Sequence, residues 1–147
     1  MSVVLSRVTY LLFPSEAEDV QRSLPSGEHV IDREVCLEES DGSKRYISWA
    51  QEPEQYCVGV KLSSWFIPSE IVEIDMSSHI LWKSLVGSAL DVVWHDDKHQ
   101  VLEIRADRSP VYLSSREADR WFADTISVSG ARPALQSDAA MERSRDA

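Results

Sequence analysis

The chain has 147 residues, of which 43% are hydrophobic and 27% are charged, and its formal net charge is -10. This length fits one domain that buries about two thirds of its unfolded surface without a metal or disulfide, and the composition excludes an intrinsically disordered chain. The acidity disfavours binding to nucleic acid or to anionic membranes and favours basic partners or cations, although it can also serve solubility alone.

The first apolar run, residues 3–13, predicts a strand. A signal peptide is disfavoured because Arg7 interrupts the run and no small-residue cleavage site follows it. No other run approaches the roughly eighteen apolar residues of a membrane span, so we expect a soluble protein. Cys36 and Cys57 are interpreted as two buried thiols of a cytoplasmic protein, and a bridge between adjacent strands is the alternative.

A short helix is expected over residues 16–24, because acids occupy its first turn, where the helix dipole favours them. Residues 33–39 and 44–50 flank the sequence Ser40-Asp41-Gly42-Ser43, and an Asp-Gly pair between alternating segments predicts a β-hairpin. Further strands are predicted over residues 56–63 and 71–74.

Residues 77–87 predict a second short helix, with a capping serine and a terminal glycine. Alternating apolar residues then predict three strands around residues 90–94, 102–104 and 111–113. Ser114 and Glu117 form a capping box, which predicts a helix over residues 115–122, and residues 125–129 predict a last strand. We therefore expect an α+β domain over residues 1–129, mainly an antiparallel sheet of hairpins or a meander with two or three short helices, followed by a flexible tail at 130–147.

One segment contains several potential metal ligands, namely His95, Asp96, Asp97 and His99. Imidazole and carboxylate groups suit zinc or manganese. However, a tight turn between two strands would send these side chains in different directions, so we interpret the segment as a polar turn and expect no metal or other cofactor.

Other catalytic patterns are missing from the sequence. The glycines stand alone, which argues against phosphate-binding loops, and no serine lies in a nucleophile elbow. His29 and His79 are single residues near element boundaries, where a cap or turn role is expected. Glu38 and Glu39 would point to opposite faces of a strand and therefore could not flank one substrate bond. We expect no enzymatic activity.

A binding surface is suggested by two adjacent aromatic residues beside a proline, Trp65 and Phe66. Aromatic anchors contribute much of the energy of protein interfaces. We hypothesise that these aromatics combine with nearby acids into a surface that binds a basic protein; the acids are Glu38, Glu39, Asp41, Glu52 and Glu54.

Two short segments carry a family resemblance. Tyr46-Ile47-Ser48-Trp49 follows the Asp-Gly turn, and Trp82-Lys83-Ser84-Leu85-Val86-Gly87 comes some thirty residues later. Over residues 35–113 this pattern resembles small acidic bacterial proteins, some of which look like immunity proteins of toxin systems. The resemblance implies a single-domain cytoplasmic protein that binds and blocks a cognate toxin, and it carries over no catalytic residue.

Three classes of function therefore stay open. The first is a protein-binding module, such as an immunity or inhibitor protein with a basic partner. The second is a small ligand-binding or regulatory domain, which would need an apolar pocket lined by tryptophan. The third is an enzyme, which would need titratable groups that converge in a cleft. Strand order, oligomeric state and the partner are not predicted.

Overall fold

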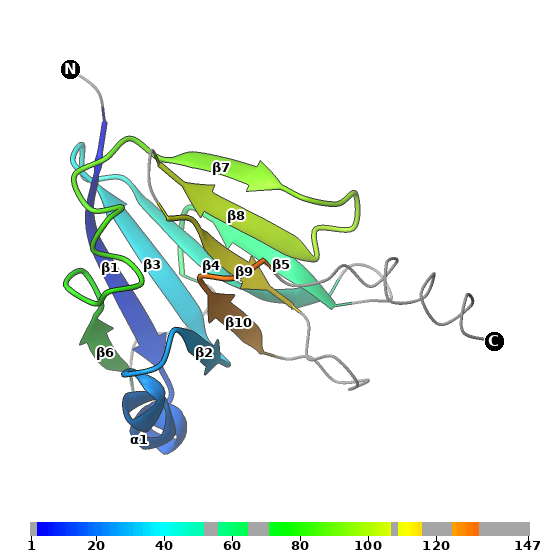
Figure 1. Cartoon of the computed structure of the whole chain (residues 1–147). Helices are drawn as coiled ribbons and strands as arrows, with labels where there is room; N and C mark the ends of the chain where they lie inside the picture. Colours follow the sequence, from blue (N-terminus) through cyan, green and yellow to red (C-terminus); the bar gives the residue numbers. More distant parts are fainter. Residues whose placement is uncertain (1–2, 52–55, 65–70, 107–108, 116–124, 133–147) are drawn as a thin grey trace.

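The computed structural model describes residues 3–51, 56–64, 71–106, 109–115 and 125–132. Within these residues the chain forms ten β-strands and one α-helix, α1 (Pro14–Ser23). The strands form two five-stranded antiparallel sheets that pack face to face, as Figure 1 shows. The prediction of an α+β domain dominated by antiparallel sheet is thus confirmed at this level.

Each sheet combines strands from distant parts of the chain. The first sheet has the order β5-β4-β3-β1-β6 and consists of β1 (Leu5–Leu12), β3 (Glu34–Glu39), β4 (Lys44–Gln51), β5 (Tyr56–Lys61) and β6 (Val72–Asp75). The second has the order β2-β10-β9-β8-β7 and consists of β2 (Glu28–Ile31), β7 (Asp91–Trp94), β8 (Val101–Arg105), β9 (Val111–Ser114) and β10 (Ile126–Ser129).

The β3–β4 hairpin forms where the Asp-Gly signal predicts it. Gly42 has a φ of 88°, a conformation that costs glycine little and other residues more. Ser43 donates hydrogen bonds from its backbone N–H (2.9 Å) and its hydroxyl (2.6 Å) to Asp41 Oδ1. These two bonds lower the pKa of Asp41 below its usual value. The turn therefore stabilises itself, and it sets the register that pairs Glu38 with Lys44.

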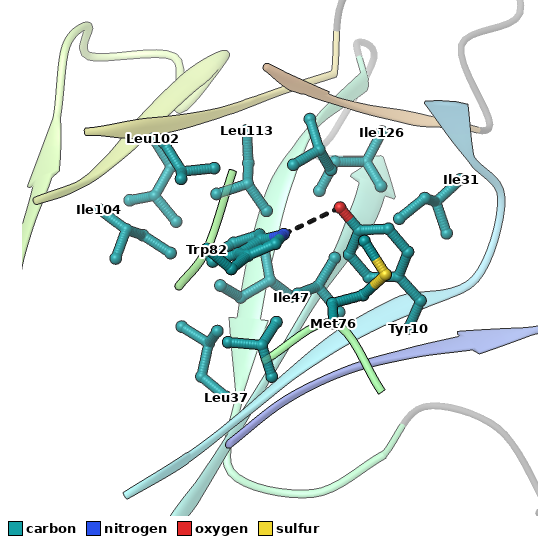
Figure 2. Close-up of a cluster of buried hydrophobic side chains, with 14 of the residues drawn as sticks. Tyr10, Ile31, Leu37, Ile47, Met76, Trp82, Leu102, Ile104, Leu113 and Ile126 are labelled. Atoms are coloured by element: carbon teal, nitrogen blue, oxygen red, sulfur yellow. Dashed lines mark hydrogen bonds between the residues drawn. The ribbon is translucent and has the colours of Figure 1, made fainter. Parts of the chain in front are cut away.

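The core lies between the two sheets and is filled by their alternating inward residues. Trp82, from the loop between β6 and β7, is fully buried at its centre, where Figure 2 shows it among aliphatic side chains of both sheets. The strands contribute Val8, Tyr10, Leu12, Val35, Leu37, Ile47, Leu102, Ile104, Val111, Leu113, Ile126 and Val128. Within β1, β3, β8, β9 and β10 these core residues occupy every second position, the spacing typical of strands that turn one face towards a core.

The prediction of two or three helices is wrong for residues 77–87, which form consecutive turns and not a helix. His79 Nδ1 accepts the backbone N–H of Leu81 (3.0 Å), and Gly87 donates to Leu5 O (2.7 Å) on β1. Side-chain and long-range bonds thus replace part of the helical ladder, while Trp82 enters the core. The predicted glycine end is present, because Gly87 has a φ of 88°.

The observed bounds of the other elements agree only in part with the predicted ones. Helix α1 matches the first predicted helix to within two residues at its start and one at its end, whereas β2 was not predicted. The predicted helix at 115–122 lies almost wholly outside the described residues, as does the predicted tail beyond Arg132. Cys36 and Cys57 are both buried thiols outside any disulfide, as expected. In the part of the chain that the structure describes, no helix is both long and apolar enough to cross a membrane.

Candidate functional site

Two of the three hypothesised acids of the β3–β4 hairpin, Glu38 and Glu39, face basic residues of the same hairpin. Glu39 forms an ion pair with Arg45 (3.2 Å), and its side chain is only 11% exposed. Glu38 lies directly opposite Lys44, which favours the pairing of opposite charges across the strands. Glu39 is therefore compensated and Glu38 faces a base, whereas Asp41 in the turn is exposed and forms no ion pair among the described residues.

The remaining members of that surface lie outside the described residues, namely Glu52, Glu54, Trp65 and Phe66. Their proximity to the hairpin acids therefore stays a prediction. Leu62, three residues before the aromatic pair, is 82% exposed. An apolar side chain this exposed is consistent with a contact region after β5, but a single exposed leucine is also common on protein surfaces.

Uncompensated acids lie at the opposite end of the first sheet, around α1, β2 and β6. Glu18 and Asp19 on α1 share one base, because Arg22 contacts the first at 3.2 Å and the second at 3.5 Å. Glu28 on β2 and Glu73 on β6 are exposed and form no ion pair among the described residues. Helix α1 packs beside β2, and β6 begins opposite the end of β1, just before α1 (Figure 1). This acidic end, defined by these four acids, carries a surplus of negative charge.

The turn between β7 and β8 contains the four potential metal ligands, and their side chains diverge. Asp96 accepts backbone N–H groups of Gln100 (2.9 Å) and Val101 (3.1 Å), so its carboxylate shapes the loop. His99 has a φ of 55° and stacks on Trp94, with ring centroids 4.0 Å apart. Among the described residues, no three His, Cys, Asp or Glu side chains are placed to hold one metal ion.

His95 contacts a carboxylate on the neighbouring strand. Its Nε2 atom lies 2.6 Å from Glu103 Oε1, and Glu103 Oε2 lies 3.6 Å from Arg105 NH1. Arg105 also pairs with Asp91 at 3.2 Å. This row of polar side chains links β7 and β8 on the outer face of the second sheet and supports the pairing of the two strands.

A chain of hydrogen bonds crosses the otherwise apolar core, and sequence patterns did not reveal it. Trp82 Nε1 donates to Tyr10 Oη (2.9 Å), as the dashed line in Figure 2 shows, and Tyr10 Oη lies 2.9 Å from His29 Nδ1. His29 Nε2 in turn lies 3.1 Å from Ser26 O. His79 Nε2 bonds the carbonyl of Leu24, at the end of α1. The chain thus ties the core to the end of α1.

The donors and acceptors in this chain determine the state of both imidazoles. The atoms within reach of His29 Nε2 are carbonyl oxygens, which only accept, so Nε2 carries the proton and Nδ1 accepts the hydroxyl proton of Tyr10. His79 Nδ1 accepts a backbone N–H, which fixes the same tautomer there. Burial is the main cause that lowers the pKa of His29, and the nearby His79 ring, at a centroid distance of 5.0 Å, adds to the effect. His29 is therefore neutral in the fold.

A second titratable pair lies at the start of α1. Glu16 Oε1 accepts the N–H of Phe13 and its Oε2 accepts the N–H of Asp32, both at 3.3 Å. Burial, followed by the hydrogen bond and the repulsion between the Glu16 and Asp32 carboxyl groups, raises the pKa of Glu16 from 4.5 to about 8. Glu16 is therefore protonated near neutral pH, beside the Asp32 carboxyl group.

Replacing Glu16 with glutamine tests this raised pKa of Glu16. Because the pKa of Glu16 is higher in the folded than in the unfolded chain, the wild-type protein loses stability as pH rises from 4.5 to about 8. The Glu16→Gln variant has no such loss. Its free energy of unfolding should therefore rise relative to wild type by about 1–2 kcal/mol between pH 5 and pH 8.5, a value discounted because Glu16 is only half-buried. Urea unfolding at several pH values measures the difference.

The exposed Glu18 provides the matched control. A Glu18→Gln variant should keep a nearly constant difference from wild type over the same pH range, because this side chain is 82% exposed. A pH-independent difference for Glu16→Gln as well would show that Glu16 does not hold the proton.

Comparisons with known proteins reveal no relationship: no family model, no curated protein and no solved structure matches the chain.

Proposed function

We propose that the protein is a non-enzymatic binding module that uses its acidic surface to bind a basic protein, as an immunity protein binds a toxin. The main support is the acidic end, where Glu18, Asp19, Glu28 and Glu73 have too few basic neighbours to balance them. Surface charges of this kind raise the rate of association with an oppositely charged partner. A cytoplasmic location belongs to the same proposal.

The internal bonding of the histidines also supports binding over catalysis. The imidazoles of His29 and His79 bond the carbonyls of Ser26 and Leu24 after α1, and His95 Nε2 bonds Glu103 on the neighbouring strand. These hydrogen bonds give each imidazole a structural role. A protein–protein interface requires no chemistry from them, only exposed groups that complement the partner.

The proposal is tested with the product of the adjacent gene, because an immunity protein and its toxin are expected to be encoded together. The purified full-length proteins are mixed, and the association rate is measured by stopped-flow fluorescence at increasing salt. We expect a stable complex whose association slows steeply as salt rises, because screening weakens long-range attraction.

Charge reversal locates the attraction. The double variant Glu18→Lys, Asp19→Lys should associate roughly threefold to tenfold more slowly, since both side chains are exposed at the acidic end. The control, Glu38→Lys, changes an acid that already faces a base, and a smaller effect is expected. Absence of any complex at micromolar concentration, or association that is independent of salt, would contradict the proposed function.

A further inference from the structure

The two sheets have four edge strands, and two of these edges are bonded by nearby loops. On β5, the outward N–H of Val58 donates to His99 O at 2.8 Å. On β2, the carbonyl of Glu28 accepts the hydroxyl of Ser26 at 2.7 Å. Open strand edges invite pairing with other chains, and loops that satisfy edge groups reduce that tendency. The remaining edges belong to β6 and β7.

Edge strand β6 leaves two residues with open backbone groups. Met76, just after β6, donates its N–H to Val8 O on β1 at 2.8 Å. Since antiparallel pairing alternates, every second residue from Met76 back along β6 bonds β1, and the backbone groups of Glu73 and Asp75 face away from the sheet. Among the described residues, neither Glu73 nor Asp75 has a backbone partner on this side.

The side chains beside these open groups are acidic and exposed. Hydrogen bonds from the hydroxyl of Ser77 and from its backbone N–H, the latter to Asp75 Oδ1 at 2.9 Å, lower the pKa of Asp75 and so keep it ionised. Asp75 also lies 3.5 Å from Arg7, whereas Glu73 has no ion pair among the described residues. On the other face of β6, Val72 and Ile74 pack against the core. The edge thus presents backbone hydrogen-bonding groups together with alternating carboxylates.

These charges decide between possible occupants of the edge. A second copy of β6 would bring Glu73 and Asp75 against the same carboxylates, and like charges directly opposite each other destabilise a strand pair. An extended segment with Lys or Arg at every second position would place its cations opposite the carboxylates. On β7 the open backbone groups belong to Val92 and Trp94, whose side chains carry no charge to select a partner.

We propose that β6 is the docking edge for an extended basic segment of the partner, which adds a strand to the first sheet antiparallel to β6 (Figure 1). This inference rests on the proposed function, because it assumes a basic partner. It adds the mode of recognition: main-chain bonds to Glu73 and Asp75 supply the pairing, and their carboxylates select alternating cations.

The test uses an acetylated and amidated hexapeptide of alternating Lys and Val, titrated into the 15N-labelled full-length protein. We expect a dissociation constant on the order of 1 mM, because the edge offers only two open residues. The amide signals of Glu73 and Asp75 should shift on binding, and their hydrogen exchange should slow. Shifts confined to α1, or no binding at several millimolar, would overturn the proposal.

Backbone methylation separates strand pairing from simple charge attraction. A lysine opposite Glu73 in an antiparallel pair must donate its own N–H to the edge, so N-methylation of the lysines should weaken binding at least tenfold. N-methylation of the valines, whose N–H groups face solvent, should leave binding within about twofold. Equal binding of the two methylated peptides would show that β6 does not pair with the peptide as a strand.

Two matched variants locate the site and separate this inference from the proposed function. Glu73→Lys should weaken peptide binding roughly threefold to tenfold, whereas Asp97→Lys makes the same charge change in the exposed turn between β7 and β8 and should have less than a twofold effect. If the natural basic partner binds normally to Glu73→Lys, the docking edge is wrong and the proposed function stands. If neither the peptide nor that partner binds wild type, both proposals fail.

Discussion

Replacing Trp82 with alanine is expected to lower the free energy of unfolding by about 3–5 kcal/mol, the range for a large buried aromatic residue. Trp82 is fully buried between the two sheets, and its indole N–H donates the first bond of the buried polar chain. The variant leaves a cavity and removes a donor from Tyr10 Oη. For a chain of this length the melting temperature should fall by roughly 10–15 °C, which calorimetry or thermal circular dichroism measures.

Two further variants separate the cavity from the hydrogen bond. Trp82→Phe keeps an aromatic ring but removes the N–H, and a loss of about 1–3 kcal/mol is expected. Trp94→Ala is the control, because Trp94 is only partly buried and stacks on the exposed His99. A loss for Trp82→Ala no greater than that for Trp94→Ala would show that Trp82 does not organise the core.

The central position of Trp82 is one of the features that the sequence could not predict. Residues 77–87 contain helix signals at both ends, a serine and a glycine, but contacts distant in sequence determine their conformation. Leu5 donates to Ser88 O (2.9 Å) and accepts from Gly87, so β1 draws the segment onto its own edge. Local propensity competes with such tertiary bonds and often loses.

Strand β2 shows a different limit. Its sequence, Glu-His-Val-Ile, has one buried position occupied by a histidine, so the alternation of apolar and polar residues is not visible. Partners distant in sequence or outside the strand accommodate the buried ring of His29, namely Tyr10 on a strand of the other sheet and carbonyls at the end of α1. By contrast, the β3–β4 hairpin was predictable because Asp41 and Gly42 form the turn by themselves.

The candidate site was predicted only in its chemical character. Net charge predicted an acidic surface, and the sequence pattern placed Glu38 and Glu39 on a strand. The bases Arg45 and Lys44 face the acids Glu39 and Glu38 because of the strand register, which follows from the turn. The open edge of β6, in contrast, depends on the order of strands across the whole sheet. Strand order is set by long-range packing, and no local pattern encodes it.

Acidification below about pH 6.5 is expected to weaken the fold through His29. Burial lowers the pKa of this imidazole in the folded chain below 6.5, so the unfolded chain binds the additional proton first. The stabilising contribution of neutral His29 is therefore present above pH 6.5 and is lost as pH falls towards the lowered pKa. Protonated Nδ1 would also present an N–H to the Tyr10 hydroxyl, which now donates to it. The other titratable groups facing the ring are Tyr10 and His79.

The His29→Gln variant measures this contribution by difference. At pH 7.5 it should be less stable than wild type by about 1–3 kcal/mol, because Tyr10 loses a buried acceptor, but it has no imidazole to protonate. The free energies of unfolding of the two proteins should therefore converge as pH falls from 7.5 to 5. Because both proteins contain Glu16, the comparison at each pH cancels the opposite trend from that residue.

His99→Asn is the control, since His99 is exposed and asparagine tolerates its positive φ. This variant should keep the wild-type acid response. A constant gap between wild type and His29→Gln would mean that His29 does not titrate with folding, and the buried polar chain would then contribute packing alone.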